Sequence, residues 1–261
     1  MKVIQRLGLV ALVYGLTGAG TLFLPDMVFP VQAQEAPAAP APAAGTGAGL
    51  SRSEVAERLN IVPVFTVVSK DGTPILANVD QEGTTLQVAS FWLGQEQATA
   101  AITQIQTANP DIAAEAQVIP VSLGYAYEVA EQQRQQSENL VFQVLPRPSD
   151  VESAMQIVKA NGQTDIEDFP GIPLFYGVSA QGILTIERDG VEVVPFFFAQ
   201  QDLQLTLDRA AAENAEVTQA TKIEVTTLEQ VVDSMLDSSA AADIEKIAFV
   251  PSRDSSSMFR I

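Results

Sequence analysis

Residues 62–72 read Val-Pro-Val-Phe-Thr-Val-Val-Ser-Lys-Asp-Gly, and residues 172–182 read Ile-Pro-Leu-Phe-Tyr-Gly-Val-Ser-Ala-Gln-Gly. Proline, phenylalanine, valine, serine and glycine recur in register at an offset of 110 positions. Each stretch is rich in β-branched and aromatic residues and closes on a glycine, which predicts a strand that ends in a turn.

Two shorter echoes follow in the same order along the chain. Residues 91–93, Phe-Trp-Leu, match residues 197–199, Phe-Phe-Ala, at an offset of 106, and residues 144–146 match 249–251 at 105. A unit of this length is longer than the 20–50 residues of a solenoid repeat. Chance similarity between two Pro-Phe strands is the alternative, but the shared order favours a duplicated half-domain. We therefore expect two halves packed about a pseudo-two-fold axis, with a groove or paired pockets between them.

The alternation of strand and helix patterns predicts a mixed α/β (α+β) fold. Each half is expected to follow the order β-β-β-α-β-α-β, with one more helix joining the halves and with helices packed on a mixed sheet. The predicted organisation is a signal peptide, an Ala/Pro/Gly-rich linker, two repeat units and a polar C-terminal tail, at residues 1–33, 34–52, 53–160, 161–251 and 252–261.

The N-terminus has the pattern of a secretory signal. Lys2 and Arg6 precede an apolar run, residues 7–24, and Val31 and Ala33 supply the small residues that signal peptidase accepts. An uncleaved membrane anchor is the alternative, because eighteen apolar residues are close to the roughly 20 that span a bilayer. The glycines in the run and the cleavage pattern favour removal after Ala33, so no stable membrane insertion of the mature chain is expected.

The charge of the chain is strongly negative. Its 14 basic and 32 acidic residues give a net charge of −18, and removal of Lys2, Arg6 and Asp26 with the signal takes this to −19. A surface of this charge repels nucleic acid and anionic membranes, so neither is predicted as a partner.

Histidine and cysteine are both absent from the sequence, which restricts the available chemistry. A zinc site built on those ligands and a Ser-His-Asp or Cys-His nucleophile are excluded. The acidic cluster at residues 165–168 lacks the glycine and the terminal glutamate of a calcium loop. No catalytic residue, metal or cofactor is predicted, and the chain is not expected to be an enzyme.

Aromatic runs on predicted strands are the remaining signal. Phe91 and Trp92 are adjacent, and residues 195–198 read Pro-Phe-Phe-Phe. Because successive side chains of a strand face opposite sides of the sheet, some of these rings point away from one core. Core packing and an apolar binding surface are both open interpretations at this point.

At these residues the chain resembles a known family. Val-Pro-Val-Phe-Thr at 62–66, Ile-Pro-Leu-Phe at 172–175, Val-Pro-Phe-Phe-Phe at 194–198 followed by Gln-Gln-Asp-Leu, and Phe-Val-Pro-Ser at 249–252 are similar to the twenty-two-kilodalton Tic subunit family. Its members are the intermembrane-space component of the chloroplast import translocon and cyanobacterial periplasmic relatives. The resemblance covers roughly residues 55–252.

This resemblance implies a non-enzymatic handler of proteins in transit, with a duplicated α/β fold and apolar grooves. An ATP-independent periplasmic chaperone for unfolded or precursor polypeptides is expected, with outer-membrane assembly or translocon components as further partners; the thylakoid lumen stays open as a second location. A binding module for an apolar small molecule or lipid in the inter-repeat cleft is the competing class. The groove role is expected at Phe65, Phe91, Trp92, Phe175, Tyr176, Phe197 and Phe198.

Overall fold

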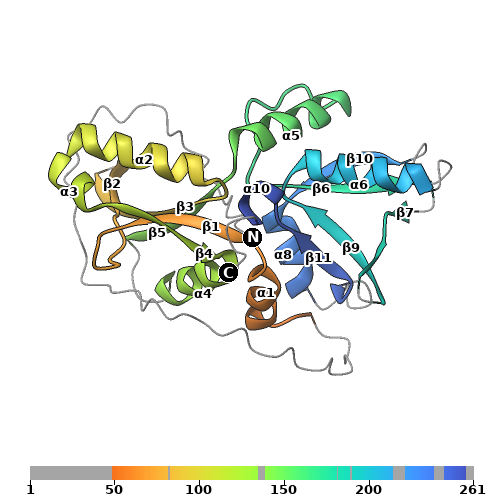
Figure 1. Ribbon diagram of the computed structural model, residues 1–261, viewed down its shortest axis with the longest axis horizontal. Helices are drawn as coiled ribbons and strands as arrows, with labels where there is room; N and C mark the ends of the chain where they lie inside the picture. Colours follow the sequence, from red (N-terminus) through yellow and green to blue (C-terminus); the bar gives the residue numbers. More distant parts are fainter. Residues whose placement is uncertain are drawn as a thin grey trace, which may run out of the picture.

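A computed structural model shows a mixed α/β fold with two sheets side by side and helices around them (Figure 1). The mixed α/β fold class expected from the sequence is confirmed. The structure describes residues 49–81, 83–134, 139–180, 182–188, 190–213, 221–237 and 244–256. The predicted signal peptide and most of the predicted linker lie outside these residues.

The first sheet is built from the residues of the first predicted repeat. Strand β1 lies between β4 and β3 and is antiparallel to both, β5 runs parallel to β3, and β2 forms an antiparallel hairpin with β3. The strands are β1 (Pro63–Val68), β2 (Ala77–Gln81), β3 (Thr84–Trp92), β4 (Gln117–Ser122) and β5 (Leu140–Leu145).

The second sheet has the same strand order and the same strand directions. Its order β10-β6-β9-β11 corresponds to β4-β1-β3-β5, with antiparallel, antiparallel and parallel neighbours in both sheets. The short strand β8 pairs with β9 as β2 pairs with β3, and β7 pairs with β6. The strands are β6 (Pro173–Ser179), β7 (Gly182–Ile183), β8 (Ile186–Arg188), β9 (Val191–Phe197), β10 (Lys222–Thr227) and β11 (Ile247–Val250).

The strand register corrects one of the sequence echoes. Phe65 lies opposite Trp92 in the first sheet, and Phe175 lies opposite Phe197 in the second. The structural counterpart of Trp92 is therefore Phe197, at an offset of 105, whereas the sequence comparison aligned Phe91 with Phe197 at 106. The difference matters because a shift of one residue moves a side chain to the other face of a sheet. The pseudo-two-fold axis stays a prediction.

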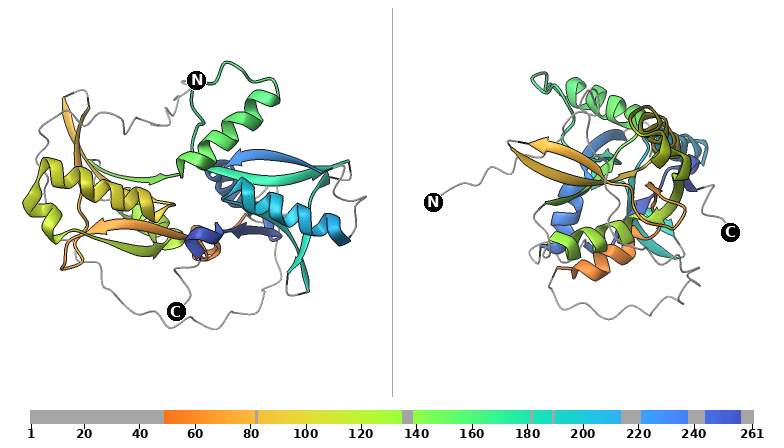
Figure 2. Two further views of the ribbon diagram at one scale, coloured as in Figure 1. Left: turned by 45° about the horizontal axis from the view of Figure 1, so that its top comes forward. Right: turned by 90° about the vertical axis from the view of Figure 1, so that its left-hand side faces the viewer.

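The helices divide between the two faces of the sheets. α1, α4 and α8 lie against the inner faces, which are turned toward the common interior, and α1 and α4 are side by side (Figures 1 and 2). α2, α5 and α6 lie on the outer faces. The helices are α1 (Arg52–Leu59), α2 (Gln95–Ala108), α3 (Pro110–Glu115), α4 (Leu123–Arg134), α5 (Pro148–Ala160), α6 (Gln200–Glu213), α8 (Leu228–Leu236) and α10 (Arg253–Ser256). Within the described residues, none of these helices combines the length and the apolar character needed to cross a bilayer.

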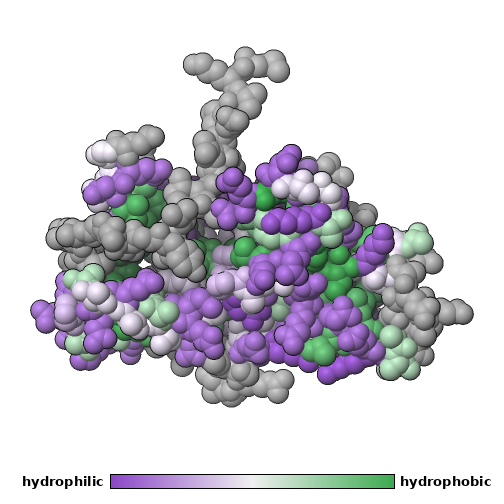
Figure 3. Space-filling view, turned by 90° about the horizontal axis from the view of Figure 1, so that it is seen from above, coloured by the Kyte–Doolittle hydropathy of each residue, from purple (hydrophilic) through white to green (hydrophobic). Residues whose placement is uncertain are grey.

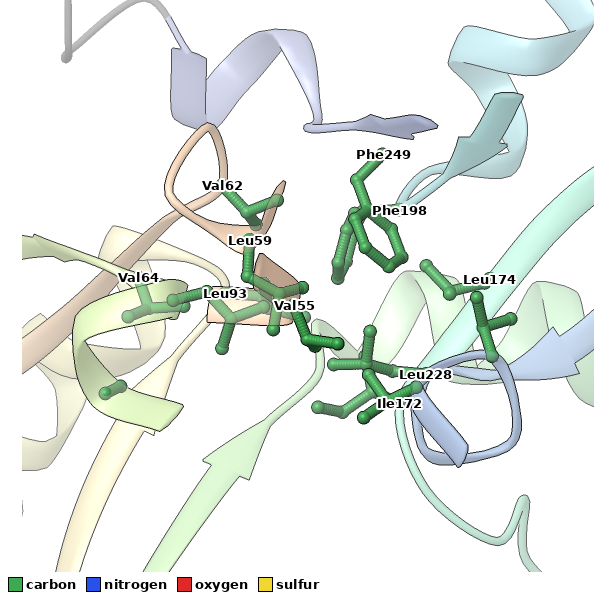
Figure 4. Close-up of a cluster of buried hydrophobic side chains, with 14 of the residues drawn as sticks. Val55, Leu59, Val62, Val64, Leu93, Ile172, Leu174, Phe198, Leu228 and Phe249 are labelled. Carbon is green, nitrogen blue, oxygen red and sulfur yellow. The ribbon is translucent and has the colours of Figure 1, made fainter. Parts of the chain in front are cut away.

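One buried cluster joins the two halves, and we call it the shared core. It takes side chains from the inner faces of both sheets and from α1, α4 and α8, and Figure 4 shows its centre. The rings of Phe198 and Phe249 lie 6.1 Å apart within it. The groove expected between the repeats is therefore filled with packed side chains, because the apolar inner face of each sheet is covered by the other half.

Helix α1 belongs to the first half and makes hydrogen bonds to the second. Ser51 and Glu54 form a capping box at its start. From its last turn, the Arg58 guanidinium donates to the backbone carbonyl oxygens of Ile244 and Ile247, at 2.8 and 2.9 Å, just before and inside β11. The guanidinium is partly removed from water at this place, and this burial lowers the pKa of Arg58 from its usual value.

Replacing Arg58 with methionine should lower the free energy of unfolding by about 1.5–3 kcal/mol, the range for hydrogen bonds that involve a charged group. Methionine keeps the length of the apolar stem but leaves the carbonyl oxygens of the second half without this donor. Urea denaturation monitored by circular dichroism measures the change, with Arg52→Met on the same helix as the exposed control. Equal free energies of unfolding for the two variants would contradict a stabilising role of the Arg58 hydrogen bonds between the halves.

Helix α5 connects the halves and crosses between them. It follows β5 of the first sheet, yet it packs on β6 and β10 of the second. Pro148 occupies its first turn, and the preceding Arg147 makes no side-chain cap. The predicted boundary at residue 160 stays a prediction, although by its contacts α5 belongs to the second sheet.

The start of the predicted polar tail is ordered. Residues 253–256 form α10, Ser252 and Ser255 are buried, and the Ser255 hydroxyl donates to the Leu93 carbonyl oxygen at 2.8 Å. The hydroxyls of Ser252 and Ser255 are used in local hydrogen bonds and in this long-range one, and the predicted boundary of the tail stays a prediction. Residues 257–261 lie outside the described part.

Candidate functional site

The structure buries most of the aromatic residues that were expected to form a groove. Phe65, Phe91, Phe175, Phe197 and Phe198 each expose 3% of their surface or less. Trp92 and Tyr176 are half-buried. The burial follows from helices or the opposite sheet covering both faces at these positions. In this conformation five of the seven expected groove residues build the core instead of a surface.

These residues separate onto the two faces of the sheets. Phe91, Phe198 and Tyr176 lie on the inner faces, where the ring of Tyr176 is 5.5 Å from that of Phe196. Partial burial raises the pKa of Tyr176, with the nearby Glu224 carboxylate as the smaller cause. Phe65 and Trp92 form an opposed pair on the outer face, as do Phe175 and Phe197.

Exposed apolar side chains gather at another place, on the outer face of the first sheet. Val79 lies opposite Leu86, and Val88 lies opposite Val141, so all four share the face of Trp92. Val79 and Val141 are exposed, Leu86 and Trp92 are half-buried, and Val88 is buried between them. We call these five residues the first strip.

The second sheet carries a similar strip in the corresponding place. Ile186 lies opposite Val193 and Ala248 opposite Pro195, while Val191 shares their face from two residues along β9. Val191 is 61% exposed, the highest value among the exposed large hydrophobic residues of the described chain. We call these five residues the second strip. Val191 and Val193 are the counterparts of Leu86 and Val88 at the offset of 105.

The outer helices are displaced to one side of each strip. α2 lies over β1, β3 and β4, and α5 and α6 lie over β6, β9 and β10, whereas the strips extend onto β2, β5, β8 and β11. Figure 3 shows apolar side chains at the surface of both halves, and in the first half they lie in a hollow with hydrophilic rims. The two strips occupy corresponding places on the two sheets.

Carboxylates and hydroxyls lie on the opposite face of the strands that carry the strips. In the first sheet, Thr85 donates to the Asp80 carboxylate on that face. Glu192, on the opposite face of β9 from Val191 and Val193, accepts from Thr185 and pairs with Lys246 at 3.1 Å. The hydrogen bond from Thr185 and the pairing with Lys246 lower the pKa of this exposed carboxyl, so it stays ionised at neutral pH.

A metal-binding group or a hollow would be an alternative kind of site in the described part of the chain. The described residues contain no group of three or more carboxylates that could hold a metal ion. Two open hollows are lined by mixed polar and apolar side chains: one of about 510 Å³ lies between the turn after β1 and α3, and one of about 480 Å³ lies between α5, α6 and β10. Neither lies in the interior between the sheets, where the small-ligand interpretation placed its cleft.

The sequence contains a signal for the first strip that the aromatic search missed. Along β3, Leu86, Val88 and Trp92 alternate with Ala89 and Phe91, so both faces of the strand are apolar. Such a strand needs cover on two sides, and the described helices supply it over only part of the outer face. A comparison of the apolar faces with the number of predicted helices would have indicated an uncovered region.

Comparison with known proteins gives a consistent family match. The model of the Tic22-like family matches residues 15–260. The TIC 22-like chloroplastic protein of Arabidopsis thaliana is 25% identical over 214 residues, which cover 80% of this chain and 64% of the relative. The TIC 22 chloroplastic protein of Pisum sativum is 25% identical over 204 residues, which cover 78% of this chain and 75% of the relative. The chain thus spans just under two thirds of the length of the Arabidopsis relative.

Two solved structures share the fold. Anabaena Tic22, described as a protein of protein transport, superposes with a TM-score of 0.70 at 23% identity, covering 81% of this chain and 97% of its own. Tic22 from Plasmodium falciparum gives a TM-score of 0.62 at 21% identity, covering 78% and 95%. At these identities the likeness establishes a common fold.

Proposed function

The chain belongs to the Tic22-like family, and from this premise we propose that it is a protein-transport factor that holds unfolded client polypeptides without ATP. Anabaena Tic22 bears the description protein transport, and the plant relatives bear the names of TIC proteins. The proposed partners are unfolded or precursor polypeptides, together with outer-membrane assembly or translocon components.

The observation that carries the proposal is the pair of partly exposed apolar strips on a strongly acidic chain. Apolar surface gives affinity for the apolar segments of an unfolded chain, roughly in proportion to the area buried. A net charge of −18 limits self-association of the same apolar surface. The sequence has no phosphate-binding glycine loop after a strand, so the release of clients is proposed to depend on equilibrium dissociation.

The location is proposed from the sequence pattern at the N-terminus. A cleaved signal peptide would deliver the mature chain to a periplasm, where unfolded outer-membrane proteins pass in transit. The plant relatives carry chloroplastic in their names, which fits a family that handles proteins crossing an envelope. The thylakoid lumen is the second compartment compatible with the same signal.

Substitution of one exposed residue in each strip tests the proposal. The double variant Val141→Ser, Val191→Ser should weaken the binding of an unfolded outer-membrane protein by about tenfold or more, because burying one such side chain contributes about 1.5 kcal/mol or more. Fluorescence anisotropy of a labelled client gives the dissociation constant, and suppression of its aggregation at near-stoichiometric ratios gives the activity.

The control is the double variant Ile61→Ser, Ile183→Ser, which removes two exposed aliphatic residues that lie outside the strips, one from each half. It should bind the client as the parent does, and circular dichroism should show that both variants are folded. Equal binding by the strip variant and the parent would remove the strips from the site. A parent that holds no client but melts at a higher temperature with a lipid or metabolite would support the small-ligand function instead.

A further inference from the structure

Strand β5 forms one margin of the first sheet, and no other described strand pairs with its outer edge. The carbonyl oxygens of Asn139, just before β5, and of Leu145, at its end, accept hydrogen bonds from the β3 side at 2.8 and 3.0 Å. Because alternate residues of a strand bond to the same neighbour, the odd-numbered residues of β5 face β3. The backbone N–H and C=O groups of Leu140, Phe142 and Val144 therefore point away from the sheet.

The corresponding edge of the second sheet is partly occupied by a side chain. The β9 side donates to the carbonyl oxygens of Lys246 and Val250, so that Ile247 between them faces away from the sheet. The Ile247 carbonyl oxygen accepts from the Arg58 guanidinium at 2.9 Å. Ile247 is the counterpart of Phe142 at the offset of 105. Helix α1 thus covers on β11 a position for which the described residues provide no cover on β5.

The repeat explains why the first sheet has no such donor. At the offset of 110 that relates residues 62–72 to residues 172–182, Arg58 corresponds to Asp168. An ionised carboxylate accepts hydrogen bonds and cannot donate them. Residues 161–171 also form no helix that could take the place of α1.

Other edges of the two sheets carry residues that discourage strand pairing. β4 contains the exposed Pro120, which has no N–H, and β10 contains Lys222 and Glu224. β5 reads Leu-Val-Phe-Gln-Val-Leu, with neither a charge nor a proline. An apolar edge strand without these protections is a template for pairing with another chain.

We propose that the outer edge of β5 binds an extended segment of a client polypeptide as one more strand of the first sheet, through backbone hydrogen bonds to Leu140, Phe142 and Val144. In this mode the main chain supplies the affinity, so that clients of different sequence can bind at one place. The inference rests on the proposed function, because it names the conformation in which the client is held.

The side chains of β5 determine what kind of segment fits beside it. Leu140, Phe142 and Val144 lie on the inner face, where they are half-buried and pack against the shared core. Apolar residues of an added strand gain contacts on this face, because cross-strand neighbours interact. On the outer face Gln143 donates to the Ser90 hydroxyl, so polar neighbours are accommodated there. The segment is therefore expected to alternate apolar and polar residues, as the strands of a membrane β-barrel do.

Amide hydrogen exchange of the mature chain, measured by NMR, tests the edge directly. The probe is a synthetic peptide of about ten residues, the length of a membrane β-strand, that alternates valine and threonine. In the free protein, the amides of Phe142 and Val144 should exchange faster than those of Val141 and Gln143, which face β3. Saturating peptide should slow exchange at Phe142 and Val144 by about tenfold or more, because these amides gain hydrogen bonds. A peptide of the same composition with its valines in one block should protect them less.

A proline on the edge separates backbone pairing from side-chain contact. Val144→Pro removes one outward N–H and leaves the bonds to β3, which come from the neighbouring residues. Val144→Ala keeps the N–H and loses part of the side chain, so it is the matched control. The proline variant should bind the peptide about tenfold more weakly than the parent, and the alanine variant no more than about threefold more weakly. Circular dichroism establishes that each variant is folded, and Leu140→Pro, at the first residue of β5, replaces an unfolded Val144→Pro.

The outcomes separate this inference from the proposed function. Absence of peptide binding, unchanged exchange at Phe142 and Val144 in the presence of bound peptide, or equal affinities of the proline and alanine variants would each overturn pairing at β5. The strip variants and the unfolded outer-membrane protein then decide independently whether clients bind through the strips. Slower exchange in the parent together with a loss of binding specific to the proline variant would support the edge, whatever the strip variants show.

Discussion

Replacing Phe198 with alanine is expected to lower the free energy of unfolding by about 3–5 kcal/mol, the range for removing a buried phenylalanine. Phe198 is 3% exposed and lies in the shared core with Leu174 and Phe249, at the place where the two halves meet. The cavity left by the ring cannot close easily, because the shared core around it is close-packed with side chains from both halves. Equilibrium denaturation in guanidinium chloride, followed by circular dichroism, measures the loss.

The matched control is Val141→Ala, a truncation on the exposed first strip that should change the free energy of unfolding by less than about 0.5 kcal/mol. The shared core also predicts that both halves unfold in one cooperative transition. A loss below about 1 kcal/mol for Phe198→Ala, or two separate transitions in the parent, would contradict a core common to both halves.

Replacing Gly124 with valine is expected to cost about 3 kcal/mol, the upper part of the usual range for overpacking. Gly124 is the second residue of α4, where α4 crosses α1, and an added Cβ would overlap the Ala56 carbonyl oxygen and the Asn60 side chain. The Ala56 carbonyl is backbone, so α1 as a whole has to move away. That movement would also pull Arg58 from the carbonyl oxygens near β11.

Gly124→Ala separates the steric effect from helix propensity. Propensity alone predicts a gain of roughly 0.5–1 kcal/mol when alanine replaces glycine inside a helix. The close approach of α1 predicts a loss, smaller than that for valine. Thermal and chemical denaturation of both variants give the sign, and a gain in stability for alanine would show that α1 and α4 are not in close contact at this point.

Much of the fold could be predicted from the sequence, because the repeat is carried by residues with strict positional demands. Proline is tolerated at the first residue of a strand, and Pro63 and Pro173 are the first residues of the equivalent strands β1 and β6. The offset of the second echo could not be settled by residue type. Phe91, Trp92 and the three phenylalanines at 196–198 are alike in hydrophobicity, and only the hydrogen-bonded register distinguishes 105 from 106.

The candidate site was less accessible to prediction for a different reason. Aromatic side chains such as Phe65 and Phe175 bury large areas, so strands that contain them are covered first by helices. The apolar residues that stay exposed are smaller ones such as Val79, Val141 and Val191, and no sequence motif marks them. When both faces of a strand are apolar, the positions of the helices determine which part of it stays exposed. Sequence order does not give those positions, because α5 follows the first sheet in the chain but packs on the second.

The crossing of α5 also sets an order of events for a chain that emerges N-terminus first. Its apolar residues Val151, Ala154, Met155 and Val158 pack on strands that end at residue 227. During emergence, the first half is therefore complete in sequence while its final helix still has no surface to cover. Since domains tend to fold as they appear, this helix remains an exposed apolar segment until about seventy more residues have followed. If the proposed function holds, the emerging chain therefore exposes for a time the same kind of apolar segment as the clients that it would bind.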